Sequence, residues 1–316
     1  MDKRPLGGTG FAIAPLVLGG NVFGWTADEK RSFALLDAFV DAGLNAIDTA
    51  DAYSSWVPGN AGGESETIVG KWLKANPGKR DKVVIVTKVG SEMGPGRKGL
   101  GAAYVAEAAE ASLRRLGVDA IDVYLSHWPD PATPYEETLA AYAKLIAAGK
   151  VRSVGASNLD AAQLGEALKV AKDKGLPRYE VLQPEYNLYD RARLDGPLLA
   201  LCRGEGLGVI TYFSLAKGFL SGKYRGEADF AKSPRGRGIA GYLTPRGFAI
   251  LGALDEVALN HGAQPAEVAL AWVMAKPGIT APIASATTLD QLRSLVRATE
   301  LTLSPDEVAA LDAAGA

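Results

Sequence analysis

Residues 121–157 read IDVYLSHWPDPATPYEETLAAYAKLIAAGKVRSVGAS and contain two strand patterns on either side of one helix pattern. The runs at 121–127 and 151–157 are short and largely apolar, which is typical of buried strands. Between them, 134–150 is rich in Ala, Leu, Lys and Glu and closes on Gly149 followed by Lys150, a common helix ending. A strand, a helix and a second strand predict parallel strands joined by a helical crossover.

The same unit recurs along the chain, and this repetition predicts the fold. Helix patterns such as 28–43 and 102–117 alternate with eight strand patterns, at 15–20, 45–49, 82–89, 121–127, 151–157, 180–187, 208–214 and 279–286. Eight such units in 316 residues favour a closed (β/α)8 barrel over an open doubly wound sheet, and no GxGxxG turn follows a strand. No linker or low-complexity block interrupts the pattern, so we expect one domain spanning 1–316.

Three kinds of segment fall outside the eight-fold repeat. Residues 3–13 predict a short β-hairpin with GGTG as its turn, which would close the floor of the barrel. Residues 215–246 form a long insertion after the seventh strand, and insertions of this length are usually functional or disordered. Residues 265–278 and 304–314 predict two extra helices. The predicted fold is therefore an α/β TIM barrel with an N-terminal β-hairpin cap and two extra helices.

Composition and charge exclude several classes of partner and site. The chain carries 34 basic and 36 acidic residues without a concentrated basic stripe, which argues against nucleic acid or a membrane as its partner. Cys202 is the only cysteine, so an intramolecular disulfide is excluded and a reducing, cytoplasmic location is expected. The two histidines, His127 and His261, lie far apart, so no metal site is predicted. The oligomeric state is left open.

Polar side chains gather where the predicted strands end, and in a (β/α)8 barrel the chemistry lies at the carboxyl ends of the strands. Lys88 is the most informative of them, because a lysine in an apolar strand is costly unless it is paired. Taken singly, Asp48 fits a turn residue, Tyr53 fits core packing and His127 fits a buried hydrogen-bonded imidazole. The whole set comprises Asp48, Tyr53, Lys88, His127, Ser157, Asn158, Gln183 and Tyr212.

Taken together, four of these residues suit the reduction of a carbonyl group, which needs a hydride on carbon and a proton on oxygen. Tyr53 can donate the proton, but a reference pKa of about 10 makes tyrosine a weak acid. A nearby Lys88 ammonium is expected to lower the pKa of Tyr53, with Asp48 holding that ammonium in place. His127 is expected to hydrogen-bond the substrate oxygen. Asp51, between the acid and the phenol, is expected to face solvent.

A series of motifs then resembles the aldo-keto reductases, NAD(P)H-dependent enzymes on a (β/α)8 barrel. The motifs occur in the family's order over nearly the whole chain: RPLGGTGFAIAPLVLGG, IDTADAY, VTKVG, SHWPDP, VGASN, LQPEYN, YFSLAKGFLSGKY and ASATTLDQL. The loop SLAKGFLSGKY is similar to the bacterial and potassium-channel-β-subunit branch rather than to the vertebrate aldose reductases.

The resemblance implies a role for each matching position. Asp48, Tyr53, Lys88 and His127 match the catalytic tetrad, with Tyr53 as the general acid. The implied cofactor-binding residues are Ser157, Asn158 and Gln183 at the nicotinamide carboxamide, Tyr212 stacked on the ring, Ser214, Leu215, Ala216, Gly218 and Lys223 in the pyrophosphate loop, Arg235 reaching the phosphates, and Ser285, Thr287, Thr288 and Gln291. The implied substrate mouth is lined by Trp25, Trp56 and Trp128.

Several positions depart from the family pattern. Thr287 and Thr288 stand where many relatives carry Lys or Arg for the 2′-phosphate of NADPH, and loss of a basic partner weakens phosphate preference. NADP(H) is therefore the family default, while NAD(H) stays open. Ser214, Ser285 and the pair Ser294–Leu295 also differ from the usual residues.

The predicted function is reduction of an aldehyde or ketone to the alcohol, or the reverse, with the physiological direction and the identity of the small-molecule substrate left open. A first alternative is a regulatory protein that binds a nicotinamide dinucleotide and has weak reductase activity. A second is a barrel hydrolase with paired carboxylates, which the sequence disfavours because Asp48 and Asp51 lie in one loop.

Overall fold

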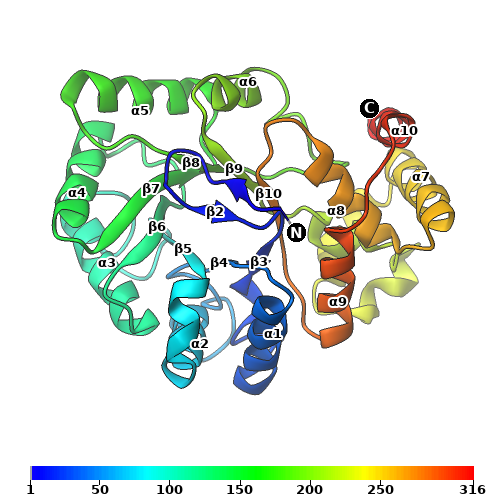
Figure 1. Ribbon diagram of the computed structural model, residues 1–316, viewed down its shortest axis with the longest axis horizontal. Coiled ribbons are helices and arrows are strands. Elements are labelled where there is room, and N and C mark those ends of the chain that lie inside the picture. The colour runs from blue at the N-terminus through cyan, green and yellow to red at the C-terminus, as the bar shows by residue number, and fades with distance from the viewer. Residues whose placement is uncertain (1) are drawn as a thin grey trace.

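A computed structural model describes residues 2–316, and its centre is a closed barrel of parallel strands (Figure 1). The eight strands are β3 (Val17–Gly19), β4 (Ala46–Asp48), β5 (Val84–Val89), β6 (Ile121–Ser126), β7 (Val151–Ser157), β8 (Val181–Gln183), β9 (Gly208–Thr211) and β10 (Ala281–Ala284). β10 pairs with both β9 and β3, which closes the ring. Each strand lies within a predicted strand pattern, so the (β/α)8 barrel is confirmed.

Helices surround the barrel, and local sequence signals set several of their ends. The ring consists of α1 (Glu29–Asp41), α2 (Glu64–Ala75), α3 (Ala102–Leu116), α4 (Tyr135–Ala147), α5 (Ala161–Lys174), α6 (Pro197–Gly204), α8 (Pro265–Ala275) and α9 (Leu289–Ala298). Asp28 begins α1 by accepting a 2.8 Å hydrogen bond from the Arg31 amide. Gly117, in the left-handed conformation that glycine tolerates, ends α3.

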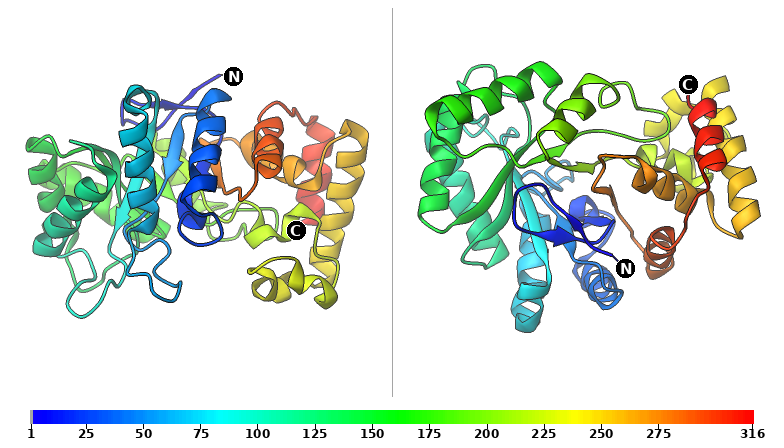
Figure 2. Two further views of the ribbon diagram at one scale, coloured as in Figure 1. Left: turned by 90° about the horizontal axis from the view of Figure 1, so that it is seen from below. Right: turned by 45° about the horizontal axis from the view of Figure 1, so that its top comes forward.

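The predicted hairpin closes one end of the barrel. β1 (Arg4–Pro5) and β2 (Ala12–Ile13) pair antiparallel, and Leu6 and Ile13 belong to the cluster of apolar side chains that fills the barrel interior. Gly7 has a φ of +57°, and a Cβ there would meet the Glu180 carbonyl oxygen at 2.2 Å, so glycine is required for this close approach. Figure 2 shows the hairpin at one end of the barrel and the long insertion at the other.

The extra helices differ in part from the prediction. α10 (Pro305–Ala314) agrees with the expected segment 304–314, but α8 packs against β10 and α9 and so belongs to the ring. The second helix outside the ring is α7 (Pro245–His261), which packs against α8 and α10 (Figure 1). The assignment of 265–278 as an extra helix is therefore wrong. Every side chain of α8 from 267 to 274 is buried, which requires cover on both faces of the helix.

The insertion after β9 is ordered as three short helical turns. They are η3 (Ala216–Ser221), η4 (Glu227–Lys232) and η5 (Gly236–Tyr242). A further turn, η1 (Gly20–Val22), follows β3, and η2 (Pro77–Lys82) precedes β5. Within residues 2–316, none of the helices combines the length and the apolar character that crossing a membrane requires.

Candidate active site

The alternation of side chains along two neighbouring strands brings an acid and a lysine into the barrel. In β4, Ala46 faces the interior and Ile47 the helices, so the next residue, Asp48, faces inward again. In β5, Val84 and Val86 face the interior, and Lys88 continues that series. β4 and β5 are paired, with Asp48 opposite Val86, so Lys88 lies just beyond the acid.

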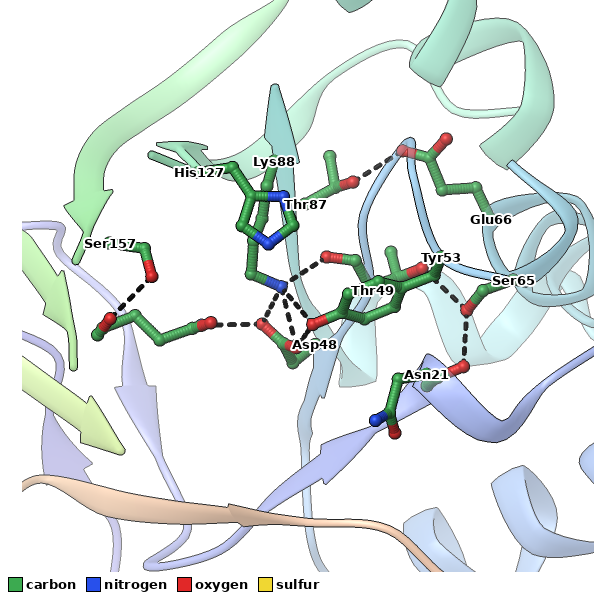
Figure 3. Close-up of polar contacts among 12 residues, drawn as sticks. Asn21, Asp48, Thr49, Tyr53, Ser65, Glu66, Thr87, Lys88, His127 and Ser157 are labelled. Carbon is green, nitrogen blue, oxygen red and sulfur yellow. Dashed lines mark hydrogen bonds and ion pairs between the residues drawn. The ribbon is translucent and has the colours of Figure 1, made fainter. Parts of the chain in front are cut away.

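The Lys88 ammonium is fully buried and has a partner for each of its three protons (Figure 3). Its Nζ lies 2.8 Å from Asp48 Oδ2, from the Thr49 carbonyl oxygen and from the Tyr53 hydroxyl. A buried ammonium is costly unless it is paired and hydrogen-bonded in this way. The contacts of Lys88 therefore hold the acid at the end of β4 and the phenol of the following loop in a defined geometry.

The Asp48 carboxylate is equally well partnered. The Tyr53 hydroxyl donates to Asp48 Oδ2 at 2.8 Å, and Gln183 Nε2 donates to Asp48 Oδ1 at 2.7 Å. Four side chains from β4, its loop, β5 and β8 thus form one hydrogen-bonded group, which we call the Asp48 network: Asp48, Tyr53, Lys88 and Gln183.

The pKa of Tyr53 departs from the sequence prediction. Burial first, and then the negative charge of Asp48, raise the pKa of the Tyr53 hydroxyl well above 10. Burial likewise lowers the pKa of Lys88, although Asp48 opposes that change. The expected lowering of the Tyr53 pKa by Lys88 is therefore wrong for the protein alone, because burial and the charge of Asp48 together raise that pKa.

His127 lies beside this network and is kept neutral. Its ring centroid lies 6.1 Å from that of Tyr53. Burial, and secondarily the positive charge of Lys88, lower the pKa of His127 well below 6.5. A neutral imidazole donates from one nitrogen and accepts at the other, so its chemistry depends on which nitrogen carries the proton.

A serine that the sequence analysis did not single out hydrogen-bonds the imidazole of His127. Trp128 Nε1, which can only donate, points at Ser91 Oγ at 3.2 Å, and Ser91 Oγ lies 3.0 Å from His127 Nδ1. Because a hydroxyl oxygen has two lone pairs, Ser91 Oγ can accept from both Trp128 Nε1 and His127 Nδ1, or it can donate to Nδ1. In the second arrangement the proton of His127 lies on Nε2. Ser91 follows β5 closely, so its position past a strand's carboxyl end was the available signal.

A cavity of about 1250 Å³ opens above these residues, larger than the roughly 300–1,000 Å³ of a typical small-ligand pocket. Most predicted site residues line it: Trp25, Asp48, Tyr53, Trp56, His127, Trp128, Ser157, Asn158, Gln183, Tyr212, Ser214, Leu215, Gly218, Lys223, Arg235, Ser285, Thr287 and Gln291. Three do not. Lys88 and Ala216 are fully buried, and Thr288 is exposed at the start of α9, where its hydroxyl accepts from the Gln291 amide. Thr288 is therefore a helix cap in this structure.

One side of the cavity has the features that a dinucleotide needs. Tyr212 donates to Asn158 Oδ1 at 2.7 Å, and Asn158 Nδ2 donates to the His127 carbonyl oxygen at 2.9 Å, which places an amide and an aromatic ring beside the Asp48 network. The following loop is strained, with positive φ at Phe213, Ala216 and Lys217, and such strain is typical of functional loops.

The donor groups of that loop suit a pyrophosphate. Gly218 also has a positive φ, and successive turns of this kind aim backbone N–H groups into a concavity that binds anions. Lys217 and Lys223 add two cations at the cavity wall. At the far end, Ser285, Thr287 and Gln291 provide neutral polar groups.

The other side of the cavity is an aromatic cup, by which we mean Trp25, Tyr53, Trp56, His127 and Trp128. The rings of Trp25 and Trp56 meet edge to face at 5.7 Å, and Trp56 meets Tyr53 at 6.3 Å. His127 stacks on Trp128 at 5.5 Å. Trp56 and Trp128 are each about half exposed, which leaves apolar surface open for a ligand.

Asp51 contradicts its prediction. It is 2% exposed rather than solvent-facing, and neither of its carboxylate oxygens accepts a well-formed hydrogen bond from any part of residues 2–316. Burial, and secondarily the charge of Glu66, raise the pKa of Asp51 to about 7. The loop after β4 turns inward here, with the Asp51 amide 3.4 Å from the Lys88 carbonyl oxygen, which the sequence pattern did not indicate.

Comparison with known proteins agrees with this geometry. The profile of the Aldo/keto reductase family matches residues 15–316. The chain is 33% identical to the uncharacterized oxidoreductase YrpG of Bacillus subtilis (strain 168), over 97% of this chain and 93% of the relative. It is also 33% identical to a probable voltage-gated potassium channel subunit beta of Oryza sativa subsp. japonica (99% and 96%) and to the aldo-keto reductase YhdN of Bacillus subtilis (strain 168) (92% and 85%).

Proposed function

The chain belongs to the aldo/keto reductase family, and on that premise we propose that it reduces an aldehyde or ketone to the alcohol with a reduced nicotinamide dinucleotide. The family is one of oxidoreductases that generally use NAD(P)H. The observation that carries the proposal is the Asp48 network, in which a phenol is hydrogen-bonded to a buried ammonium at the cavity wall. A neutral histidine adjoins it on the same wall.

The residues of the site divide the work of protonating a carbonyl oxygen. When bound, the dinucleotide supplies a hydride to the carbonyl carbon. His127, with its proton on Nε2, donates a hydrogen bond to the substrate oxygen and polarises the carbonyl. Tyr53 then gives its proton to that oxygen, which has become a strongly basic alkoxide. Lys88, already 2.8 Å from the phenol oxygen, stabilises the phenolate that is left.

A raised pKa of Tyr53 is compatible with this role. It keeps the phenol protonated throughout the neutral range, so the donor is always loaded. An alkoxide is a much stronger base than a phenolate, so the proton transfer is downhill even from a weak acid. In the reverse reaction the same group would accept the proton from an alcohol.

The predicted proton donor is tested with Tyr53→Phe. We expect kcat to fall by roughly 10²–10⁴-fold, the usual contribution of a general acid, while dinucleotide affinity and thermal stability change little. The measurement is loss of reduced-nicotinamide absorbance with a panel of aldehydes, alongside a dinucleotide titration. Turnover within a few fold of wild type would show that Tyr53 is not the donor.

The choice between NADPH and NADH is tested at the far end of the cavity. We propose that NADH is accepted, since Thr287 and Thr288 stand where many relatives carry a Lys or Arg for the 2′-phosphate of NADPH. Thr287 lines the cavity whereas Thr288 caps α9, so Thr287→Arg should increase the affinity for NADPH relative to NADH and Thr288→Arg should not. Parallel titrations with both dinucleotides measure the ratio. An equal shift for both variants would contradict this assignment.

One relative supports a second candidate function. The match to a probable potassium channel subunit beta suggests a protein that binds a dinucleotide and regulates a partner with weak turnover. Tight dinucleotide binding with negligible turnover on every carbonyl tried would favour this candidate. Failure to bind either dinucleotide would argue against both.

A further inference from the structure

The charges on the wall of the cavity are distributed unevenly. Its four cations all belong to the insertion that follows β9: Lys217, Lys223, Lys232 and Arg235. Of the described residues, two acids line the cavity, Asp48 and Glu92. Neither acid belongs to that insertion, so the negative charge of the wall comes from other elements.

The two acids differ in whether a cation compensates them. Asp48 Oδ1 lies 2.7 Å from Lys88 Nζ, within a buried ion pair. No cation in residues 2–316 lies within ion-pair distance of the Glu92 carboxylate, and the next cation along the chain, Arg97, pairs with Glu107 instead. Glu92 is exposed at the cavity wall, so a ligand can reach its carboxylate.

Glu92 lies on the substrate side of the cavity. It follows Ser91, whose Oγ lies 3.0 Å from His127 Nδ1 and 3.2 Å from Trp128 Nε1. These two contacts place the start of the loop after β5 against the aromatic cup. Because Glu92 lines the same cavity, its carboxylate stands at the rim of the cup, apart from the loop suited to a pyrophosphate.

Two rings of the cup offer their faces to a cation. Trp56 and Trp128 are 50% and 48% exposed, and the stacked contact with His127 covers one face of Trp128 only. Over the ring of Trp25, by contrast, the Arg235 guanidinium already lies at 5.0 Å. Tryptophan is the side chain whose ring attracts cations most strongly, and groups of aromatic rings recognise quaternary ammonium ligands. Exposed indole faces beside an uncompensated carboxylate therefore suit a positively charged ligand.

A bound dinucleotide would sharpen this difference in charge. Its pyrophosphate brings negative charge to the side where the cations of 217–235 lie, and so offsets them. At the reacting end of the cup, Tyr53 stays a neutral phenol because burial and the charge of Asp48 raise its pKa. Burial lowers the pKa of His127 and keeps its imidazole neutral. A substrate that enters the cup therefore meets the uncompensated charge of Glu92.

We propose that Glu92, together with Trp56 and Trp128, selects carbonyl substrates that carry a positively charged ammonium group away from the carbonyl. Neutral substrates of the same shape are then poorer, and anionic ones poorest. The inference rests on the proposed reductase function and adds the substrate class to it. The exposed carboxylate and the indole faces each contribute a modest share of the preference, because both contacts are partly solvated.

The test compares three aldehydes that differ in charge on one aromatic body. They are 4-(trimethylammoniomethyl)benzaldehyde, its neutral isostere 4-neopentylbenzaldehyde and the anionic 4-formylphenylacetate. A quaternary ammonium group keeps its charge at every pH and cannot form an imine with an aldehyde. Turnover is followed by the absorbance of the reduced dinucleotide. Binding is measured by calorimetry, with the protein alone and with the oxidised dinucleotide, which cannot donate a hydride.

The measured quantity is the preference for the cationic over the neutral aldehyde, as a ratio of kcat/KM and as a ratio of Kd. Comparing each ratio between wild type and variant cancels the intrinsic reactivity of the two aldehydes. Glu92→Gln should lower the preference by roughly three- to fivefold, the upper range for one exposed ion pair. Glu92→Lys should lower it further and raise the relative turnover of the anionic aldehyde. Trp56→Leu should lower it by roughly two- to fivefold through loss of a cation–π contact.

Glu300→Gln is the matched control. Glu300 is exposed and does not line the cavity, and its substitution changes the net charge by the same amount as Glu92→Gln. It should leave the preference unchanged. High ionic strength should lower the wild-type ratio towards that of Glu92→Gln and leave the ratio of the variant nearly unaltered, since salt screens an exposed charge.

Other outcomes separate this inference from the proposed function. A Glu92→Gln ratio equal to that of wild type, in turnover and in binding, would overturn the role of Glu92 and leave the reductase function standing. An equal loss in Glu300→Gln would assign the effect to net charge and also overturn that role. Cation-selective binding that Glu92→Gln abolishes, without turnover of any aldehyde by wild type, would support the cation site and overturn the reductase function.

Discussion

Asp48, the last residue of β4, and Asp51, in the loop that follows, are both almost fully buried but differ in their hydrogen-bond partners. Asp48 is 1% exposed and accepts hydrogen bonds from Lys88, Tyr53 and Gln183. Asp51 is 2% exposed, and within residues 2–316 no well-formed hydrogen bond reaches either of its oxygens. Burial is therefore the same for both acids, and the partners are what differ.

The two carboxyl groups therefore differ in whether a buried counter-charge compensates them. The ammonium beside Asp48 compensates its charge, so the pair can persist inside the barrel. Asp51 has no such partner, and its pKa of about 7 means that it takes up a proton near neutrality instead. Removing the partner of Asp48 and removing the charge of Asp51 should therefore have opposite effects on the free energy of unfolding.

The largest effect is expected from removing the partner of Asp48. Lys88→Met leaves the Asp48 carboxylate buried without its counter-charge, so we expect a loss of about 3–5 kcal/mol in the free energy of unfolding. Turnover should fall at least as far as in Tyr53→Phe, because the phenolate loses its stabilising ammonium. Denaturant unfolding measures the first quantity. A loss below about 1 kcal/mol would mean that the ion pair does not stabilise the fold.

A smaller effect of opposite sign is expected at Asp51. Its pKa in the folded protein, about 7, is above the usual 3.8, so unfolding releases a proton between these values and the free energy of unfolding falls as pH rises from about 4 to 7. Asp51→Asn removes this dependence. The variant should match wild type near pH 4 and exceed it by a few kcal/mol at pH 8.

Unfolding of both proteins as a function of pH measures this gap. A constant difference across the range would show that Asp51 is already ionised at low pH or has a partner. Turnover provides the control, since Asp51 does not line the cavity and Asp51→Asn should remain an active protein.

The smallest effect is expected from removing the hydrogen-bond partner of His127 Nδ1. This nitrogen would then be unpartnered, as the carboxylate oxygens of Asp51 are within residues 2–316. Ser91→Ala removes the hydroxyl 3.0 Å from His127 Nδ1, so the imidazole loses its hydrogen-bond partner at that nitrogen and is held less firmly toward the substrate. We expect kcat to fall by roughly tenfold, about 1.4 kcal/mol, with little change in dinucleotide affinity. Ser91→Thr, which keeps the hydroxyl, should restore most of the rate. Loss of stability without loss of rate would limit Ser91 to a structural role.

The same contrast shows how far the sequence could predict the site. The eight strands and the polar residues at their carboxyl ends follow from local patterns, and the structure brings Asp48, Tyr53, Lys88 and His127 together as predicted. The fate of Asp51 could not be predicted, because an acid in a loop has the same local signature whether it faces solvent or is buried. Ser91 was missed because a lone serine after a strand resembles any turn residue.

Similar limits apply to the extra helices and to the pair Thr287 and Thr288. The apolar pattern of 265–278 predicts a buried helix. Only the packing of α8 between β10 and α7 shows that this helix belongs to the ring around the barrel. Thr287 and Thr288 are adjacent in sequence, and only the turn into α9 separates one that lines the cavity from one that caps a helix.

By itself, the sequence determined the barrel and the identity of the residues at its rim, because alternation along a strand and strand–helix repetition are properties of neighbouring residues. The tertiary structure alone decided which of those residues are paired. Lys88 lies 40 residues from Asp48 and Gln183 lies 135 residues from it, and their distances depend on closure of the whole ring. Burial sets the cost of a charge, and the partner that offsets it comes from elsewhere in the chain.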